Sequence, residues 1–174
     1  MEYLIKPCGE VQLPEIQEMF NDAIINSTSV YDYKPRSMEY MKGWYYSKLK
    51  GNFPVIGLFN TLGDLLGFGT YGTFRNQPAY KYSIEHSIYV RKDMRGNGFG
   101  NVLLNEIIKS AVSNNYHILV GGIDADNEIS IKLHEKMGFK HAGTIKHAGY
   151  KFGKWLDLSF YQLILNTPAN PTEE

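Results

Sequence analysis

Residues 95–100, with the sequence Arg-Gly-Asn-Gly-Phe-Gly, form the segment whose composition best suits ligand binding. They follow a strand-like run at 82–90 and precede apolar residues at helical spacing. A helix N-terminus offers unpaired N–H groups and the positive end of the helix dipole, and glycine lets the backbone approach a phosphate closely. The segment predicts either an anion site suited to a pyrophosphate or a tight strand-to-helix turn.

Two common nucleotide-binding loops fit this segment poorly. A Walker A loop ends in Gly-Lys-Ser/Thr, which is absent here. A Rossmann fingerprint belongs to a βαβ unit with an acidic residue about twenty positions further on. A large part of this chain precedes the loop, which is unusual for that fold.

Glu85 is the candidate general base. Alternation along the strand-like run at 82–90 places Glu85 on the face opposite Ile84, Ile88 and Val90. A glutamate with an ordinary pKa of ~4.3 becomes a useful base when burial raises that pKa, or when it relays a proton through water. The alternative is a structural partner in an ion pair.

Composition disfavours several other classes of chemistry. Cys8 is the single cysteine, so an internal disulfide and a CxxC pair are excluded, and the five histidines show no HExxH spacing. No metal site is predicted. Eighteen acidic residues balance eighteen basic ones, which disfavours binding to nucleic acid or to anionic membranes. No signal peptide and no apolar run of ~20 residues is visible, so we expect a soluble, cytoplasmic protein.

The pattern of apolar residues predicts one mixed-sheet α/β domain. The 174 residues and 43% hydrophobic content suit a single folded domain over residues 1–165, with a disordered tail at 166–174. Ser37 can cap one helix that Gly51 ends, and Asp126 or Asn127 can cap another. The expected strands are 3–7, 53–59, 65–71, 82–90, 118–123, 140–145 and 156–165, and the expected helices are 13–26, 38–50, 101–114 and 128–137.

Two motifs resemble those of a known family. The run Glu-His-Ser-Ile-Tyr-Val at 85–90, followed by Arg-x-x-Gly-x-Gly at 95–100, resembles motif A of the Gcn5-related N-acetyltransferases. Residues 124–139 resemble motif B of the same family. The Asp-Ala-Asp-Asn start of motif B, together with residues 150–157, is similar to the phosphinothricin and methionine sulfoximine acetyltransferase subgroup. The resemblance covers roughly residues 3–165.

The resemblance implies a fold and a cofactor. The expected fold is a central, mostly antiparallel sheet flanked by helices and splayed between the fourth and fifth strands, with acetyl-CoA bound there. In such a site the loop amides hold the pyrophosphate, and the end of the fourth strand pairs with pantetheine. Asn127 would reach the pantetheine arm, although its type also suits a plain helix cap. The implied cofactor residues are Ile88, Tyr89, Val90, Arg95, Gly96, Asn97, Gly98, Gly100, Asn127 and Ser130.

The resemblance also assigns catalytic roles. Glu85 would take the proton from the amine. His134 stands where many family members carry a tyrosine that protonates the departing thiolate, and this departure is typical of the subgroup. A thiol pKa of ~8.5 makes that thiolate a fair leaving group, so an acid has little to contribute. His134 could instead orient the substrate or pack on its helix. No reactive cysteine lies in the motifs, which favours direct transfer in a ternary complex.

Substrate recognition is expected to use a cation for a carboxylate. Arg75 matches an arginine of the subgroup's substrate loop, and its planar fork suits that contact. Many relatives carry a second arginine where this chain has Gln77, which weakens the transfer of substrate preference. Arg36 is interpreted as an exposed loop residue. Further candidates for the substrate pocket are Tyr80, Tyr33 and Lys151, with Lys151 and Trp155 also candidates for a contact in a homodimer.

The implied activity is acetylation of the amino group of a small amino-acid-like molecule such as methionine sulfoximine, methionine sulfone or phosphinothricin. A protein N-terminus, a polyamine or an aminoglycoside is an alternative amine, although the sequence shows no acidic cluster for a polycation. A non-catalytic acetyl-CoA-binding module is a third hypothesis.

Overall fold

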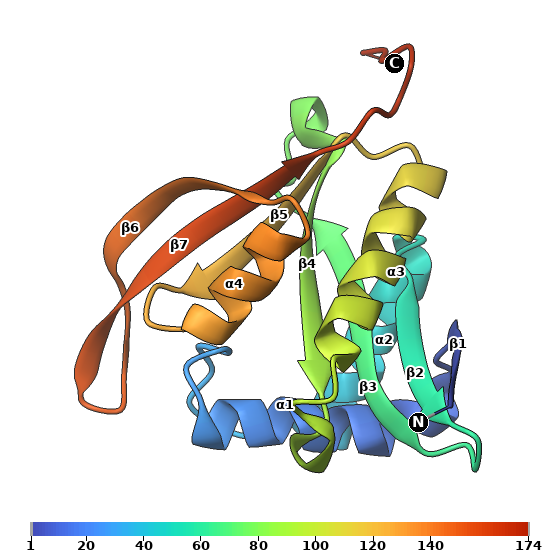
Figure 1. The fold of residues 1–174 in the computed structure, drawn as a ribbon, viewed down its shortest axis with the longest axis vertical. Helices are drawn as coiled ribbons and strands as arrows, with labels where there is room; N and C mark the ends of the chain where they lie inside the picture. The colour runs from blue at the N-terminus through green and yellow to red at the C-terminus, as the bar shows by residue number, and fades with distance from the viewer. Residues whose placement is uncertain (1, 174) are drawn as a thin grey trace. The chain divides into compact units, whose positions relative to one another are not determined.

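The computed structural model describes residues 2–173, and its helices and strands follow the predicted order (Figure 1). Three short 3₁₀ turns are added. The elements are β1 (Tyr3–Pro7), η1 (Glu10–Gln12), α1 (Leu13–Asn26), α2 (Met38–Lys50), β2 (Val55–Asn60), β3 (Leu65–Thr73), η2 (Pro78–Tyr80), β4 (Ser83–Val90), η3 (Lys92–Met94), α3 (Phe99–Ser113), β5 (Ile118–Asp124), α4 (Glu128–Lys136), β6 (Lys140–Lys151) and β7 (Lys154–Ile164).

The strands form one seven-stranded sheet in the order β1-β2-β3-β4-β5-β7-β6. The pairs β1–β2, β2–β3, β5–β7 and β6–β7 are antiparallel, whereas β4 and β5 are parallel. The β4–β5 register joins Ser83–Glu85 to Ile118–Val120, although both strands continue beyond it. The predicted splay between the fourth and fifth strands requires that β4 and β5 pair at one end only. The expected mixed α/β fold with a mostly antiparallel sheet is confirmed.

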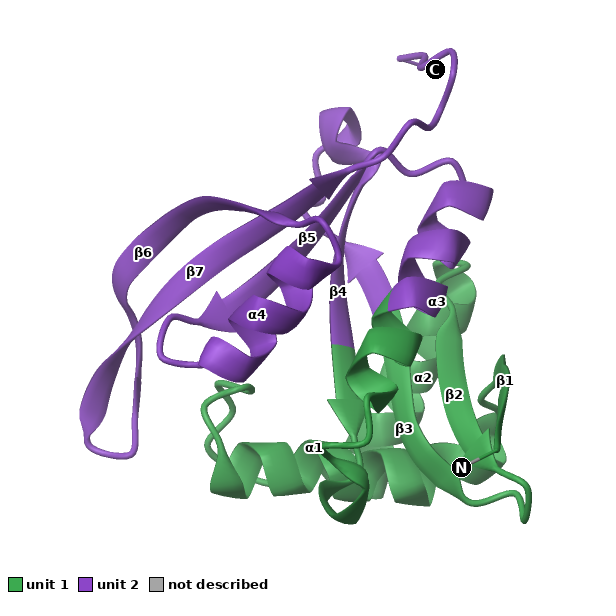
Figure 2. Ribbon diagram, in the orientation of Figure 1, with its two compact units in different colours: residues 1–70, 88–104 green, residues 71–87, 105–174 purple. Residues whose placement is uncertain are grey.

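The contacts divide the chain into two compact units, coloured separately in Figure 2. Unit 1 comprises residues 1–70 and 88–104, and unit 2 comprises residues 71–87 and 105–174. The strands β3 and β4 and the helix α3 each contribute residues to both units. The single domain over residues 1–165 stays a prediction.

Unit 1 is built on an aromatic core between its helices and strands. The Phe20 ring of α1 lies 5.3 Å from the Phe68 ring of β3 and 5.4 Å from the Trp44 ring of α2, measured between centroids. The helix α2 starts where predicted, because the Ser37 hydroxyl accepts the N–H of Tyr40, and it ends at Gly51. Each large apolar side chain buried here contributes roughly 1.5–3 kcal/mol to stability. Other members of this core are Leu13, Ile16, Met19, Met41, Tyr45, Val55, Phe59 and Leu65.

Unit 2 contains β5 and the β6–β7 hairpin (Figure 1). Leu119, Val120 and Ile123 of β5 are buried, as expected for an apolar strand covered on both faces. The prediction that β6 ends at residue 145 is wrong. The strand resumes pairing with β7 after a register shift between Ile145 and Gly149, and it runs to residue 151. Its polar, mostly exposed residues give no apolar alternation, so the strand rests on backbone pairing that sequence pattern does not reveal.

Residues after β7 also make contacts in unit 2. The Thr167 hydroxyl donates to the carbonyl of Tyr116, and the Thr172 N–H donates to the Tyr82 hydroxyl at 3.0 Å. Disorder over 166–174 stays a prediction, and residue 174 lies outside the described residues. Within residues 2–173, no helix is both long and apolar enough to cross a membrane.

Candidate active site

The glycine-rich loop lies in unit 1 and leads into α3 at Phe99. Gly96 and Gly98 adopt φ values of +81° and +79°, which only glycine reaches without strain. A Cβ at either position would meet nothing within 4 Å, so backbone conformation and not packing requires glycine there. The loop is exposed, and it places Gly96, Asn97, Gly98 and Gly100 at the start of the helix, as an anion site requires.

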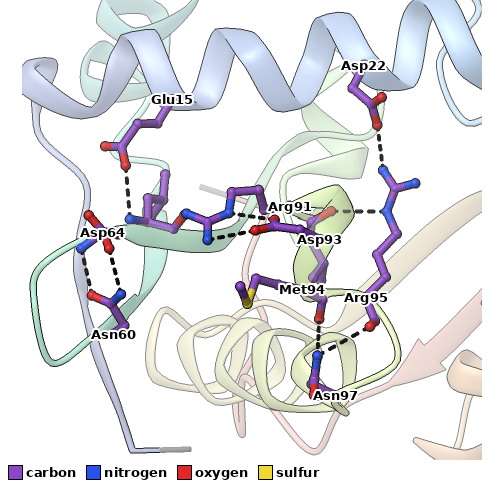
Figure 3. A network of polar contacts seen from close by, with 11 residues as sticks. Glu15, Asp22, Asn60, Asp64, Arg91, Asp93, Met94, Arg95 and Asn97 are labelled. Carbon is purple, nitrogen blue, oxygen red and sulfur yellow. Dashed lines mark hydrogen bonds and ion pairs between the residues drawn. The ribbon is translucent and has the colours of Figure 1, made fainter.

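Arg95 is tied to α1, as Figure 3 shows. Its Nη2 donates to Asp22 Oδ2 at 2.8 Å, and its Nε donates to the Val90 carbonyl at 3.2 Å. A hydrogen bond from Asn26 and the Arg95 guanidinium lower the pKa of Asp22. Surface ion pairs of this kind are worth ~0–1 kcal/mol, so a phosphate can compete with Asp22 for the guanidinium.

The same network fixes the turn after β4 (Figure 3). The Arg91 guanidinium donates to both Asp93 carboxylate oxygens, at 2.7 and 3.1 Å, and to the Leu65 carbonyl at 3.3 Å. Glu15 of α1 accepts the N–H of Leu65 at 3.0 Å. These residues border a cavity of about 790 Å³ between α1 and the turn. No motif in the sequence pointed to Asp22, Glu15 or Arg91. The partners of Asp22 and Glu15 lie far away along the chain, and Asp93, the partner of Arg91, belongs to no motif.

The end of β4 is held by its side chains in unit 1. The Tyr89 ring stacks on Phe68, with centroids 5.2 Å apart and planes at 20°. Ile88 and Val90 pack against a buried cluster that includes Leu103. These side chains therefore fix the strand, and any contact from residues 88–90 to a cofactor falls to the backbone.

Glu85 lies in unit 2 on the exposed side of β4. Partial burial raises the pKa of its carboxyl group, and the charge of Arg75 opposes that shift. A Cβ at Gly122 of β5 would lie 3.0 Å from Glu85 Oε1, so the glycine leaves room for this carboxylate. The structure thus brings the candidate base and the candidate substrate cation, Glu85 and Arg75, within electrostatic reach of each other.

His134 lies on α4 and is 3% exposed, and neither ring nitrogen faces solvent. Its Nδ1 lies 2.7 Å from the carbonyl of Ser130, and its Nε2 lies 3.0 Å from Nε2 of His86 on β4. The Nδ1 of His86 lies 2.7 Å from the carbonyl of Val120. This geometry favours the interpretation of His134 as a residue packed on its helix. This contact of His86 was not predicted from the sequence, where the residue appears only as part of the run at 85–90.

Burial lowers the pKa of both histidines. For His86 the pKa falls to about 3, first because of burial and then because of the charge of His134. For His134 the pKa is lowered by burial and partly restored by the Ser130 carbonyl.

Asn127 caps α4, because its Oδ1 accepts the N–H of Ser130 at 3.1 Å. The capping interpretation is therefore confirmed. A contact from Asn127 or Ser130 to a cofactor stays a prediction. The Ser130 hydroxyl lies 3.5 Å from His134 Nδ1.

The predicted substrate residues fall in different parts of the chain. In unit 2, Tyr80 lies beside Phe74 on the loop that carries Arg75, with ring centroids 5.9 Å apart. Lys151, at the end of β6, is buried, with its Nζ 4.9 Å from the centroid of the Phe152 ring. In unit 1, the exposed Tyr33 lines a cavity of about 600 Å³.

The interpretation of Arg36 as an exposed loop residue is wrong. Its side chain is 14% exposed, and its Nε donates to Asp32 at 2.9 Å. Its guanidinium lies 4.2 Å from the centroid of the Phe20 ring and 5.1 Å from that of Tyr40. The side chain therefore anchors the 27–37 loop to the helices.

Residues 8–159 match the family model described as the Acetyltransferase (GNAT) domain. The chain is 35% identical over 166 residues to the L-methionine sulfoximine/L-methionine sulfone acetyltransferase of Pseudomonas aeruginosa, covering 95% of this chain and 96% of that relative. The chain therefore belongs to the GNAT acetyltransferase family and is an N-acetyltransferase. The family resemblance of its motifs is confirmed.

Two solved structures are also similar. A GNAT superfamily phosphinothricin acetyltransferase from Sinorhizobium meliloti in complex with AcCoA has a TM-score of 0.93 and 27% identity, covering 98% of this chain and 93% of that chain. The ribosomal-protein-alanine N-acetyltransferase from Brucella melitensis has a TM-score of 0.91 and 38% identity, covering 93% and 99%. In residues 2–173, no group of three or more His, Cys, Asp or Glu side chains is arranged to hold a metal ion.

Proposed function

We propose that this N-acetyltransferase moves the acetyl group of acetyl-CoA to the amino group of a small amino-acid-like substrate of the methionine sulfoximine, methionine sulfone and phosphinothricin type. The observation that carries the proposal is the Glu85 carboxylate of unit 2, whose pKa is raised by burial and lowered by the charge of Arg75. A carboxylate of raised pKa can deprotonate an ammonium group, and a guanidinium can hold the carboxylate of the same molecule. The names of the relatives from P. aeruginosa and S. meliloti support this substrate class.

Acetyl-CoA supplies the acetyl group as a reactive thioester. On the chain's side, the amides of residues 95–100 and the guanidinium of Arg95 hold the pyrophosphate, and the backbone of residues 88–90 pairs with the pantetheine arm. The open space around Gly96 and Gly98 and the AcCoA complex of the S. meliloti relative support this assignment.

Glu85 accepts the proton of the substrate ammonium, directly or through one water molecule. The neutral amine then forms its bond to the acetyl carbon, and the C–S bond breaks as the thiolate of CoA departs. The nitrogen gives its second proton to water as the amide forms. Transfer is direct, with no acyl group on the protein, because Cys8 is buried and burial raises its thiol pKa to about 12. His134 is not needed as an acid, because a thiolate leaves without protonation at neutral pH.

The first test is release of CoA thiol with methionine sulfoximine, methionine sulfone, phosphinothricin, a polyamine and a peptide with N-terminal alanine. We expect turnover on the first three. In Arg75→Ala, KM for these substrates rises ~10–100-fold with kcat little changed, because a charge-assisted hydrogen bond is worth about 1.5–3 kcal/mol. Lys132→Ala is the matched control, since Lys132 is an exposed cation of unit 2 paired with Glu128.

The peptide arm tests a second candidate function. Acetylation of a protein N-terminus is favoured by the 38% identity to the ribosomal-protein-alanine N-acetyltransferase of B. melitensis. Turnover on the peptide alone would replace the small-substrate assignment with this one. Saturable CoA binding without turnover on any amine would instead indicate a binding module.

We also propose that the protein is a homodimer assembled through the β6–β7 hairpin. β6 is one of the two edge strands of the sheet, and the hairpin exposes about half of the surface of Ile145, Tyr150, Phe152 and Trp155. Open edges and exposed aromatic groups are typical of interaction surfaces.

Sedimentation should give twice the chain mass of 19.9 kDa. Trp155→Glu should weaken the dimer ~10-fold or more, because central aromatic residues contribute about 2 kcal/mol or more at interfaces. Ile129→Glu is the control, because Ile129 is 85% exposed and belongs to α4 and not to the hairpin. A monomeric wild type, or equal effects of the two variants, would rule out this interface.

A further inference from the structure

His86 and His134 form a buried pair in unit 2. Their rings make three close contacts, but two neutral rings have only two N–H groups to donate. Three contacts run in series, from the Val120 carbonyl to His86 Nδ1 at 2.7 Å, between the two Nε2 atoms at 3.0 Å, and from His134 Nδ1 to the Ser130 carbonyl at 2.7 Å. A carbonyl oxygen brings no proton, so each outer contact needs an N–H on the ring. Each neutral imidazole carries one N–H, and the two Nε2 atoms would then face each other as bare lone pairs.

The Ser130 hydroxyl does not resolve this shortage. It lies 3.5 Å from His134 Nδ1, so it could donate to that atom and free the ring's N–H for His86. In that arrangement the lone pair of Nδ1 would face the Ser130 carbonyl oxygen at 2.7 Å, which is repulsive. If the pair holds one proton more than two neutral rings carry, all three contacts become hydrogen bonds at once.

We propose that His86 and His134 take up one extra proton as a unit, shared between their Nε2 atoms, and act as positioning residues that join β4 and β5 to α4. The proton sharing follows from the pair itself. The positioning of the acetyl transfer rests on the proposed role of Glu85.

The pair is built into the strands that carry Glu85. Val120, whose carbonyl contacts His86, is the last residue of β5 in register with β4, and its register partner is Glu85. A Cβ at Gly121 would lie 2.9 Å from His86 Cε1 and 3.1 Å from His134 Nε2, so this glycine makes room for the rings as Gly122 does for Glu85. Moving the rings therefore moves the backbone next to the candidate base.

The surroundings allow one extra proton but not two. The rings are buried, and each contacts the ring of Phe139, with centroids 5.5 Å away for His86 and 5.1 Å away for His134. Once His134 is charged, burial and that charge keep the pKa of His86 at about 3, so the second ring stays neutral. The other titratable side chains on the elements around the pair are Glu85 and Tyr89 on β4, Asp124 on β5, Glu128, Lys132, Glu135 and Lys136 on α4, and Lys154, Asp157 and Tyr161 on β7.

Nitrogen-15 NMR of the histidine rings in the whole wild-type protein tests the shared proton. As pH falls below the ordinary histidine value of ~6.5, the signals of His86 and His134 should move together in one step that takes up a single proton. One strongly deshielded proton should couple to both Nε2 nuclei. His141, an exposed histidine of β6 outside the pair, provides the reference signals. Two independent steps, or rings that both stay neutral down to about pH 3, would overturn the proposal.

A substitution separates positioning from mere packing. His86→Asn keeps an N–H donor near the place of Nδ1 and removes Nε2, so His134 loses its partner. The step of the pair should vanish from the pH profile of kcat, and kcat should fall ~10-fold with KM for acetyl-CoA unchanged, since misplacement of a catalytic group by ~1 Å costs up to about 100-fold. His141→Asn should leave both unchanged.

A pH profile of kcat that His86→Asn leaves unchanged would overturn the positioning role. The NMR signature needs no substrate, and so it also stands if the variant does not fold. If the NMR signature of the shared proton is seen but the protein does not acetylate small amino acids, the proposed function fails. The proposal of the shared proton then still holds.

Discussion

Glu85→Gln is expected to lower kcat by at least about 100-fold, because glutamine keeps the size of the side chain but cannot accept a proton. KM for acetyl-CoA should not change, since the cofactor contacts proposed above lie elsewhere. Release of CoA thiol from acetyl-CoA measures both constants. Glu128→Gln is the control, because Glu128 is an exposed glutamate of α4 paired with Lys132.

The pH dependence adds a second signature to this prediction. A base works when it is deprotonated, so activity should fall on the acid side as pH drops through the pKa of Glu85. That pKa is raised by burial, so the fall should begin at a higher pH than an ordinary glutamate would give. Since the charge of Arg75 lowers the pKa, Arg75→Ala should move the fall to still higher pH.

The acid limb should be missing from the residual activity of Glu85→Gln. A glutamine variant with the wild-type rate and the wild-type profile would make Glu85 a structural partner of Arg75. The substrate contact of Arg75 would then have to be judged by KM alone.

The buried histidines shape the acid side of stability. The pKa of His134 in the folded protein is lowered by burial, so the unfolded chain binds more protons below the ordinary value of ~6.5. The stability that this neutral ring contributes is complete above that pH and is lost as pH falls towards the folded pKa.

Local signals in the sequence were enough for most of the fold. Ser37 and Gly51 bound α2 as predicted, because capping involves neighbours within a few residues. The second half of β6 was missed, because its pairing with β7 resumes only after a register shift between Ile145 and Gly149. That pairing is made by backbone hydrogen bonds, which the pattern of side chains along the sequence does not reveal.

Residues of the candidate site could be predicted from the sequence only where the residue type suits a single structural role. The positive φ angles of Gly96 and Gly98 are what a glycine-rich turn predicts. His86 gave no such signal, because a histidine on a strand suits a buried or an exposed position equally, and its partner lies 48 residues away. Arg36 was misjudged because the rings that hold it belong to α1 and α2.

Some glycine-to-alanine substitutions in unit 1 would place the new Cβ against backbone atoms. Gly67→Ala is expected to be the most destabilising of these. A Cβ at Gly67 of β3 would lie 2.6 Å from the Tyr89 carbonyl oxygen and 3.2 Å from Val90 Cα. Both are backbone atoms of β4, which cannot move aside as the end of a flexible side chain can. Forced overpacking of this kind costs about 1–3 kcal/mol or more, and each kcal/mol lowers Tm by roughly 2–4 °C in a chain of this length.

The same substitution should weaken the cofactor site, because the displaced atoms belong to the backbone proposed to pair with pantetheine. We therefore expect KM for acetyl-CoA to rise along with the loss of Tm, measured by thermal unfolding and by CoA-thiol release below the unfolding range. Gly43→Ala in α2 is the matched control, since its Cβ would meet nothing within 4 Å and alanine favours a helix by ~1 kcal/mol. A Gly67→Ala protein with unchanged Tm would show that β4 yields at Tyr89, and an unchanged KM beside a lowered Tm would place pantetheine away from this backbone.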